Sequence, residues 1–109
     1  MLYKFKSPAT ADLIMLEPHG RRVLGLIGKD VEARQGILQA AQMPAAVAAL
    51  EAAMVREEAE LAAQRQEALD KGEDWEEPAG YVSLRQRAAP FIEMLRRCQQ
   101  AGKDVVWGV

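Results

Sequence analysis

Cysteine and histidine are nearly missing from this 109-residue chain, which has one of each, Cys98 and His19. A single cysteine excludes a disulfide within the chain and every zinc site built from several cysteines. Aromatic residues make up only 6% of the chain, whereas alanine and leucine are common, and this bias favours helix. We therefore expect a single domain with an aliphatic core that needs no cofactor and no structural metal.

Long apolar runs and a strong net charge are also absent. No apolar segment approaches the roughly 20 residues that cross a bilayer. The first residues, M-L-Y-K-F-K-S, lack the continuous apolar stretch of a signal peptide. The formal net charge is −2, whereas general nucleic-acid binders need a strong positive field. The sequence thus predicts a cytoplasmic protein whose partner is neither a membrane nor a nucleic acid.

Four short segments have the pattern of strands: residues 2–6, 13–16, 37–39 and 104–109. In the first, Tyr3 and Phe5 alternate with two lysines, which is typical of a strand with one buried face. The second, L-I-M-L, is apolar on both faces and fits either a covered strand or one turn of helix. The last ends in V-V-W-G-V, and its β-branched run predicts a docked strand with Trp107 in the core.

Three helices are expected between these strands. A short helix begins near Pro18, whose missing N–H suits the first turn. The other two form an antiparallel helical hairpin over residues 44–101, because apolar residues recur along one face of each. An acidic loop over residues 72–81 joins them, and a capping box made by Ser83 and Gln86 opens the last helix.

The first arm of this hairpin is long for a domain of this size. Its 28 uninterrupted residues measure about 42 Å as helix, and a compact chain of this length is only about 35 Å across. The far end must therefore project or be covered, and the last helix is the predicted cover. Charge favours the pairing of the two arms, since residues 51–77 have a local charge of −7 and residues 78–109 one of +3.

Together the segments predict an α+β fold. It combines a small mixed sheet of three or four strands with one short helix and the long helical hairpin. The order along the chain is strand, strand, helix, strand, helix, helix, strand. The first and last strands both join the sheet, which brings the two ends of the chain into one element.

The start of the short helix is a candidate anion site. His19, Arg21 and Arg22 follow Pro18, where the free backbone N–H groups of a helix end attract anions. The alternative is a surface or capping role for His19. Catalysis would also need a nucleophile or a metal, and no such group is evident, so no catalytic residue is predicted. Small-molecule or anion binding at this helix start is the second functional hypothesis.

The last helix has a basic cluster of four arginines, Arg85, Arg87, Arg96 and Arg97. They fit an anion or RNA contact, or ion pairs with the acidic first arm of the hairpin. The absence of interleaved aromatic residues favours the ion pairs. Cys98 lies on the apolar face of the same helix, which favours a small buried side chain over a catalytic thiol.

Trp75 lies in the acidic segment E-D-W-E-E between the two arms. Exposed tryptophans are frequent anchors of protein interfaces, but this ring also fits against the end of its own hairpin. A small sheet cannot cover so long a hairpin, and uncovered apolar surface generally binds a partner. The leading functional hypothesis is therefore a non-enzymatic protein-interaction module that self-associates, as a homo-oligomer, or binds an unidentified protein.

Four parts of the chain resemble a known family: M-L-Y-K-F-K-S, Q-M-P-A-A with the following A-L-E-A-A, S-L-R-Q-R-A-x-P-x-x-E-M-L, and V-V-W-G-V. The family is a group of small uncharacterised proteobacterial proteins, the domain of unknown function numbered 1840. The resemblance runs nearly end to end. It implies a bacterial, cytoplasmic α+β domain, and it brings no activity, ligand or site residue to carry over.

Overall fold

The structure is a computed structural model that describes residues 2–76 and 83–108. In this part of the chain one sheet has the strand order β2-β1-β4-β3, with β1 (Leu2–Ser7), β2 (Thr10–Leu16), β3 (Gly36–Leu38) and β4 (Val105–Trp107). The helices are α1 (Glu17–Leu26), the short 3₁₀ helix η1 (Ala40–Gln42), α2 (Met43–Asp70) and α3 (Leu84–Ala101). The predicted α+β class and element order are confirmed.

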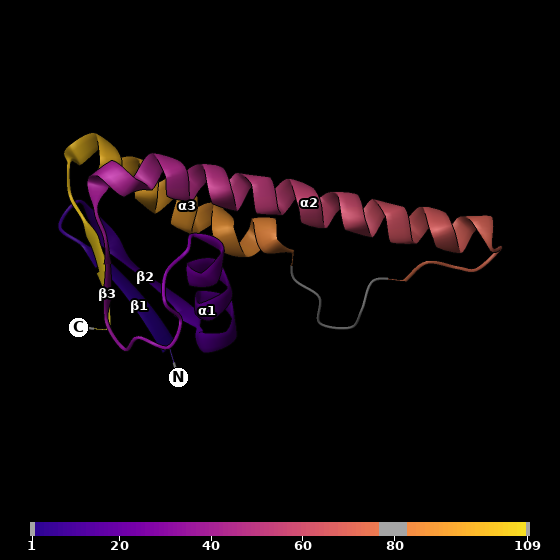
Figure 1. Ribbon diagram of the computed structural model, residues 1–109, viewed down its shortest axis with the longest axis horizontal. Coiled ribbons are helices and arrows are strands. Elements are labelled where there is room, and N and C mark those ends of the chain that lie inside the picture. Colours follow the sequence, from indigo (N-terminus) through magenta and orange to yellow (C-terminus); the bar gives the residue numbers. More distant parts are fainter. Residues whose placement is uncertain (1, 77–82, 109) are drawn as a thin grey trace.

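Every strand pairing in the described residues is antiparallel, where the sequence predicts a mixed sheet. The reason is the helical hairpin, in which α2 leads the chain away from the sheet and α3 returns it to the same end (Figure 1). β4 must then run opposite to β3, and Leu38 pairs with Val105. The end of β3 and the start of β4 are joined by a hydrogen bond, which the Asp104 carboxylate accepts from the Ala40 N–H at 3.1 Å.

The strand boundaries differ from the predicted ones by a few residues. β2 begins at Thr10 rather than at the start of 13–16, because its pairing with β1 continues down to a two-residue turn. β3 ends before the last residue of 37–39, since the chain turns there into η1. β4 occupies only the middle of 104–109, and residue 109 lies outside the described residues.

The helical hairpin is confirmed, since α2 and α3 pack against each other (Figure 1). The predicted capping box is also present. The Ser83 hydroxyl accepts from the Gln86 N–H at 3.2 Å, and the Gln86 side chain accepts from the Ser83 N–H at 3.1 Å. Of the predicted acidic loop at 72–81, only the part up to residue 76 lies in the described residues.

The core lies between one face of the sheet and the helices. Its largest side chains are three aromatic residues, Trp107, Phe5 and Phe91, all at most 1% exposed. The Phe5 ring centroid lies 4.7 Å from that of Phe91 on α3 and 5.8 Å from that of Trp107 on β4. The predicted docking of the final strand is therefore confirmed, and Phe5 links the sheet to the helical layer.

Gly36 is what allows Trp107 to lie flat against its neighbouring strand. The two residues pair directly between β3 and β4. A Cβ atom added at Gly36 would overlap the six-membered ring of the indole. A larger residue here would push the indole out of the core, so glycine is required by the close approach and not by a special backbone angle.

α2 is much longer than the layer that it covers. It has 28 residues, and its far end extends past the first residue of α3 (Figure 1). The longest dimension of the molecule is 52 Å, against 28 Å and 22 Å for the other two. The last helix is predicted to cover this arm, but α3 begins beside Glu57 and Glu58, so the far end of α2 projects beyond it.

We expect the substitution Trp107→Ala to lower the free energy of unfolding by about 3–5 kcal/mol, because it removes a fully buried aromatic side chain and leaves a cavity. Urea denaturation followed by circular dichroism measures this loss. Trp75→Ala is the matched control, since Trp75 is only half-buried, and its loss should be clearly smaller. Equal losses of unfolding free energy in the two variants would contradict the assignment of Trp107 to the core.

Candidate functional site

The three predicted anion contacts are not brought together by α1. The Arg21 guanidinium donates to Glu32 at 2.6 Å, and this bond, together with the charge of Glu32, raises the pKa of Arg21. Arg22 points to a different element, with its Nη2 atom 3.9 Å from a carboxylate oxygen of Glu57 on α2. His19 is half-buried on the same helix. Residues one or two positions apart on a helix do not face each other, so Arg21 lies away from both His19 and Arg22.

Three of the four arginines of α3 bind carboxylates of the hairpin. Two of the pairs join α3 to α2: Arg85 to Glu58 at 2.7 Å and Arg96 to Glu51 at 3.0 Å. Arg97 pairs within its own helix, with a carboxylate one turn earlier. These contacts favour the ion-pair interpretation of the basic cluster, and they account for the opposite local charges of the two arms.

Arg87 differs from the other three arginines of the cluster. It is half-buried, and its Nε–H group is enclosed without a hydrogen-bond partner in the described residues. It lies on the side of α3 that carries the buried Leu84 and Phe91. A long side chain of this kind packs its stem on apolar neighbours while its charged end reaches towards water.

Glu57 has a structural role that the sequence analysis did not identify. Its carboxylate accepts a hydrogen bond from the backbone N–H of Leu84, the first residue of α3, at 2.7 Å. The side chain of Glu57 is only 14% exposed. The first N–H groups of a helix have no partner within it, and a negative charge near them is favourable. Glu57 therefore fixes the level along α2 at which α3 begins.

Cys98 is fully buried in the core. Its Sγ atom donates to the Ser7 hydroxyl at 3.2 Å, a contact between α3 and β1. In the described residues it shares no hydrogen bond with His19. A thiol without contact with solvent behaves as a small apolar side chain, as the sequence predicts.

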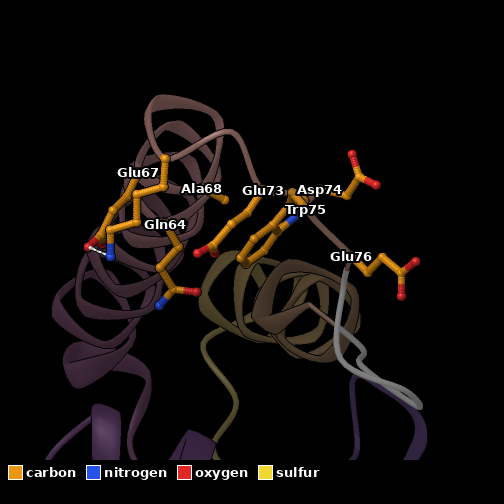
Figure 2. A pocket seen from close by; sticks show the side chains of 8 residues that line it. Gln64, Glu67, Ala68, Glu73, Asp74, Trp75 and Glu76 are labelled. Carbon is orange, nitrogen blue, oxygen red and sulfur yellow. Dashed lines mark ion pairs between the residues drawn. The ribbon is translucent and has the colours of Figure 1, made fainter.

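Trp75 folds back towards the end of α2. Figure 2 shows its ring turned to the helix, with Glu73 beside it and with Asp74 and Glu76 pointing outwards. The ring is half-buried, and a shallow cavity of about 530 Å³ lies next to it. We call residues 64–76, which carry a net charge of −3, the acidic tip.

Four cations from three parts of the chain line one cavity of about 560 Å³: Lys4 and Lys6 from β1, Arg21 from α1 and Arg34 from the segment before β3. The walls also include the apolar Leu2, Tyr3 and Val31 and the carboxylates of Glu17 and Glu32. We call this cavity the basic pocket. Its charged groups sum to +2.

Three of these cations are free to bind an added anion. Arg21 is engaged by Glu32 at 2.6 Å and by Glu17 at 3.7 Å. Across residues 2–76 and 83–108, no carboxylate lies within 4.0 Å of the charged nitrogens of the two lysines or of Arg34.

The basic pocket could not be predicted from the sequence, because its residues come from distant parts of the chain. The alternation in residues 2–6 places both lysines on the outer face of β1, but nothing local shows what lies beside them. Arg34 arrives there because its backbone packs against Gly108, whose φ of +76° and lack of a Cβ permit this contact. A contact between residues 74 positions apart leaves no periodic signal in the sequence.

None of the helices that the structure describes lies on the outer face of the sheet. Its large apolar residues are well exposed, between 44% and 61%: Leu2, Ile14, Leu16 and Ile37. Leu2 pairs with Leu16 across β1 and β2, so these two form a continuous patch. Leu2 also lines the basic pocket, together with Lys4, so the patch and the pocket adjoin.

Within residues 2–76 and 83–108, no group of three or more His, Cys, Asp or Glu side chains is arranged to hold a metal ion. None of the helices described there has the length and apolar character needed to cross a membrane.

The family resemblance is confirmed by comparison. A family profile with the description Domain of unknown function (DUF1840) matches residues 1–107. Searches of curated proteins and of solved structures return no match. The match covers every helix and strand described above, and its description names no activity.

The ion pair between Arg85 and Glu58 predicts a pH dependence of stability. The hydrogen bond from Arg85 lowers the pKa of Glu58. A carboxyl whose pKa is lower in the folded chain stabilises the fold above its unfolded pKa of about 4.3, and this contribution is lost as the pH falls through the folded value.

Glu58→Gln should therefore lower the unfolding free energy at neutral pH, and the difference from the parent protein should shrink between about pH 5 and pH 3. Urea denaturation across this range is the measurement. Glu60→Gln is the matched control, because Glu60 is an exposed carboxylate of the same helix with no ion pair in the described residues. A difference for Glu58→Gln that did not change with pH would contradict the ion pair.

Proposed function

Because the chain belongs to the DUF1840 family, whose description assigns no activity, we propose from the geometry of the molecule that it is a non-enzymatic protein-interaction module that associates with further copies of itself. One observation carries the proposal. In residues 2–76 and 83–108, no second helix lies beside the far part of α2 (Figure 1). Its length, its side chains and the bare face of the sheet each support this interpretation.

Burial along α2 stops abruptly halfway. Its buried side chains are all in the first half: Met43, Ala46, Val47, Leu50, Ala53 and Met54. From residue 55 to residue 70 none is buried. α3 begins beside Glu57 and Glu58, so residues 59–70 project with no helix beside them in the described part of the chain (Figure 1).

A projecting helix of this length gains little stability from its own residues. Twelve residues measure about 18 Å, and isolated helices of 12–15 residues are only marginally stable in water. The segment also carries apolar side chains, with Leu69 60% exposed and Leu61 half-buried. Burial of one leucine by a partner contributes about 1.5–3 kcal/mol, which favours binding over free exposure.

A second copy of the chain is the partner that the surfaces favour. The outer face of the sheet, with Leu2, Ile14 and Leu16, also lacks a cover, so one chain provides two incomplete surfaces. Two acidic tips repel each other because both carry a net negative charge. A contact between the projecting part of one copy and the sheet side of another avoids this repulsion.

Size-exclusion chromatography with light scattering, over a range of protein concentrations, tests the proposal. We expect a mass that rises above the 12.0 kDa of one chain as the concentration increases. Leu69→Gln should weaken this association, whereas Gln100→Ala, an exposed change on α3, should leave it unchanged. A mass of one chain up to the solubility limit would overturn the proposal.

A further inference from the structure

We propose that the self-association is head to tail, with the acidic tip of one copy docked in the basic pocket of the next. This inference rests on the proposed function and names its interface. It depends on three observations: the free cations of the pocket, the matching chemistry of the tip, and the distance between the two within one molecule.

The basic pocket is built for an anionic partner. Lys4, Lys6 and Arg34 face one cavity, and no carboxylate in the described residues neutralises them. Like charges that share a cavity repel one another, and an added carboxylate relieves this repulsion. Arg21 does not need such a partner, since Glu32 already binds it.

The pocket also has an apolar wall. Leu2, Tyr3 and Val31 line it beside the cations. Its volume of about 560 Å³ lies within the range of sites that enclose ligands or large side chains. The occupant with the best fit therefore has carboxylates around an aromatic or apolar centre.

The acidic tip has this composition. Trp75 is flanked by Glu73, Asp74 and Glu76, and none of these carboxylates is in an ion pair in the described residues. Asp74 and Glu76 point outwards from the ring, where they are available to a neighbour (Figure 2). Trp75 is half-buried, so part of its surface is exposed to serve as an interface anchor.

The tip of a chain cannot reach its own pocket. The pocket lies at β1 and the start of α1, whereas the tip lies at the far end of α2 (Figure 1). The part of α2 before the tip, residues 43–63, is a continuous helix about 32 Å long that does not bend back (Figure 1). The contact must therefore join two molecules.

A contact between two different surfaces of the same chain has a specific consequence. Each copy that offers its tip to one neighbour still has a free pocket for another. Such heterologous contacts produce closed rings or open chains, whereas a two-fold dimer uses the same surface on both copies. The assembly should also weaken as salt is added, because opposite charges contribute to it.

Two variants that each remove one side of the contact test this arrangement. The pocket variant is Lys4→Gln with Arg34→Gln, and the tip variant is Asp74→Asn with Trp75→Ala. We expect each variant alone to be monomeric by light scattering. An equal mixture should form a dimer with one copy of each, because one intact tip meets one intact pocket and no free pair remains for further growth.

The control variant is Arg56→Gln with Lys103→Gln. It removes the same two kinds of charge from exposed positions outside the pocket and should associate as the parent does. Circular dichroism melts of all three variants check that each is folded. If this control associates and the pocket variant does not, association depends on the position of the charges and not on the total charge.

Several outcomes would overturn the head-to-tail contact. If the pocket and tip variants each associate as the parent does, this interface is wrong and the proposed self-association stands. If the mixture stays monomeric, the two surfaces do not bind each other. If the parent itself is monomeric, the proposed function fails as well. Binding of phenyl phosphate to the pocket of such a monomer would assign the pocket to a small organic anion instead.

Discussion

The contact of Phe5 with Phe91 and Trp107 is the interaction on which the rest of the structure depends. It joins β1, α3 and β4 at ring-centroid distances of 4.7 Å and 5.8 Å. β3 and β4 have only three residues each, too few to hold a sheet by backbone bonds alone. The aromatic cluster supplies the missing burial, and Gly36 makes room for it.

A core on one side of the sheet has consequences for the surface. The helices all lie over the face that carries Phe5, so the opposite face keeps its apolar side chains in water. α2 uses its acidic residues in two ways along its length. Near α3, Glu51 and Glu58 bind arginines, and Glu57 caps the helix. Beyond them, Glu67 and Asp70 contact only Lys71 and Gln66 of the same end of the chain, and no acidic residue there binds α3 in the described residues. This division separates the part of α2 that stabilises the fold from the part available to a partner.

Local patterns predicted most of the fold because their causes are local. The alternation around Tyr3 and Phe5, the capping box at Ser83 and the opposite charges of the two arms all appear in the structure as contacts. The candidate site was predicted less well. Arg21 and Arg22 are neighbours in sequence but lie about 100° apart around the helix, so each binds a different carboxylate. Their grouping as one anion site relied on proximity in sequence, which a helix does not preserve.

The sequence by itself determined the α+β class, the order of the elements, the helical hairpin and the buried place of Trp107. Each of these follows from side-chain periodicity and from residues that begin or end a helix. Only the tertiary structure decided the antiparallel pairing, the level at which α3 starts, and the meeting of Lys4 with Arg34. These features depend on contacts between residues that are far apart in the sequence. Such contacts form when a long segment of chain closes, and the preference of a single residue does not predict them.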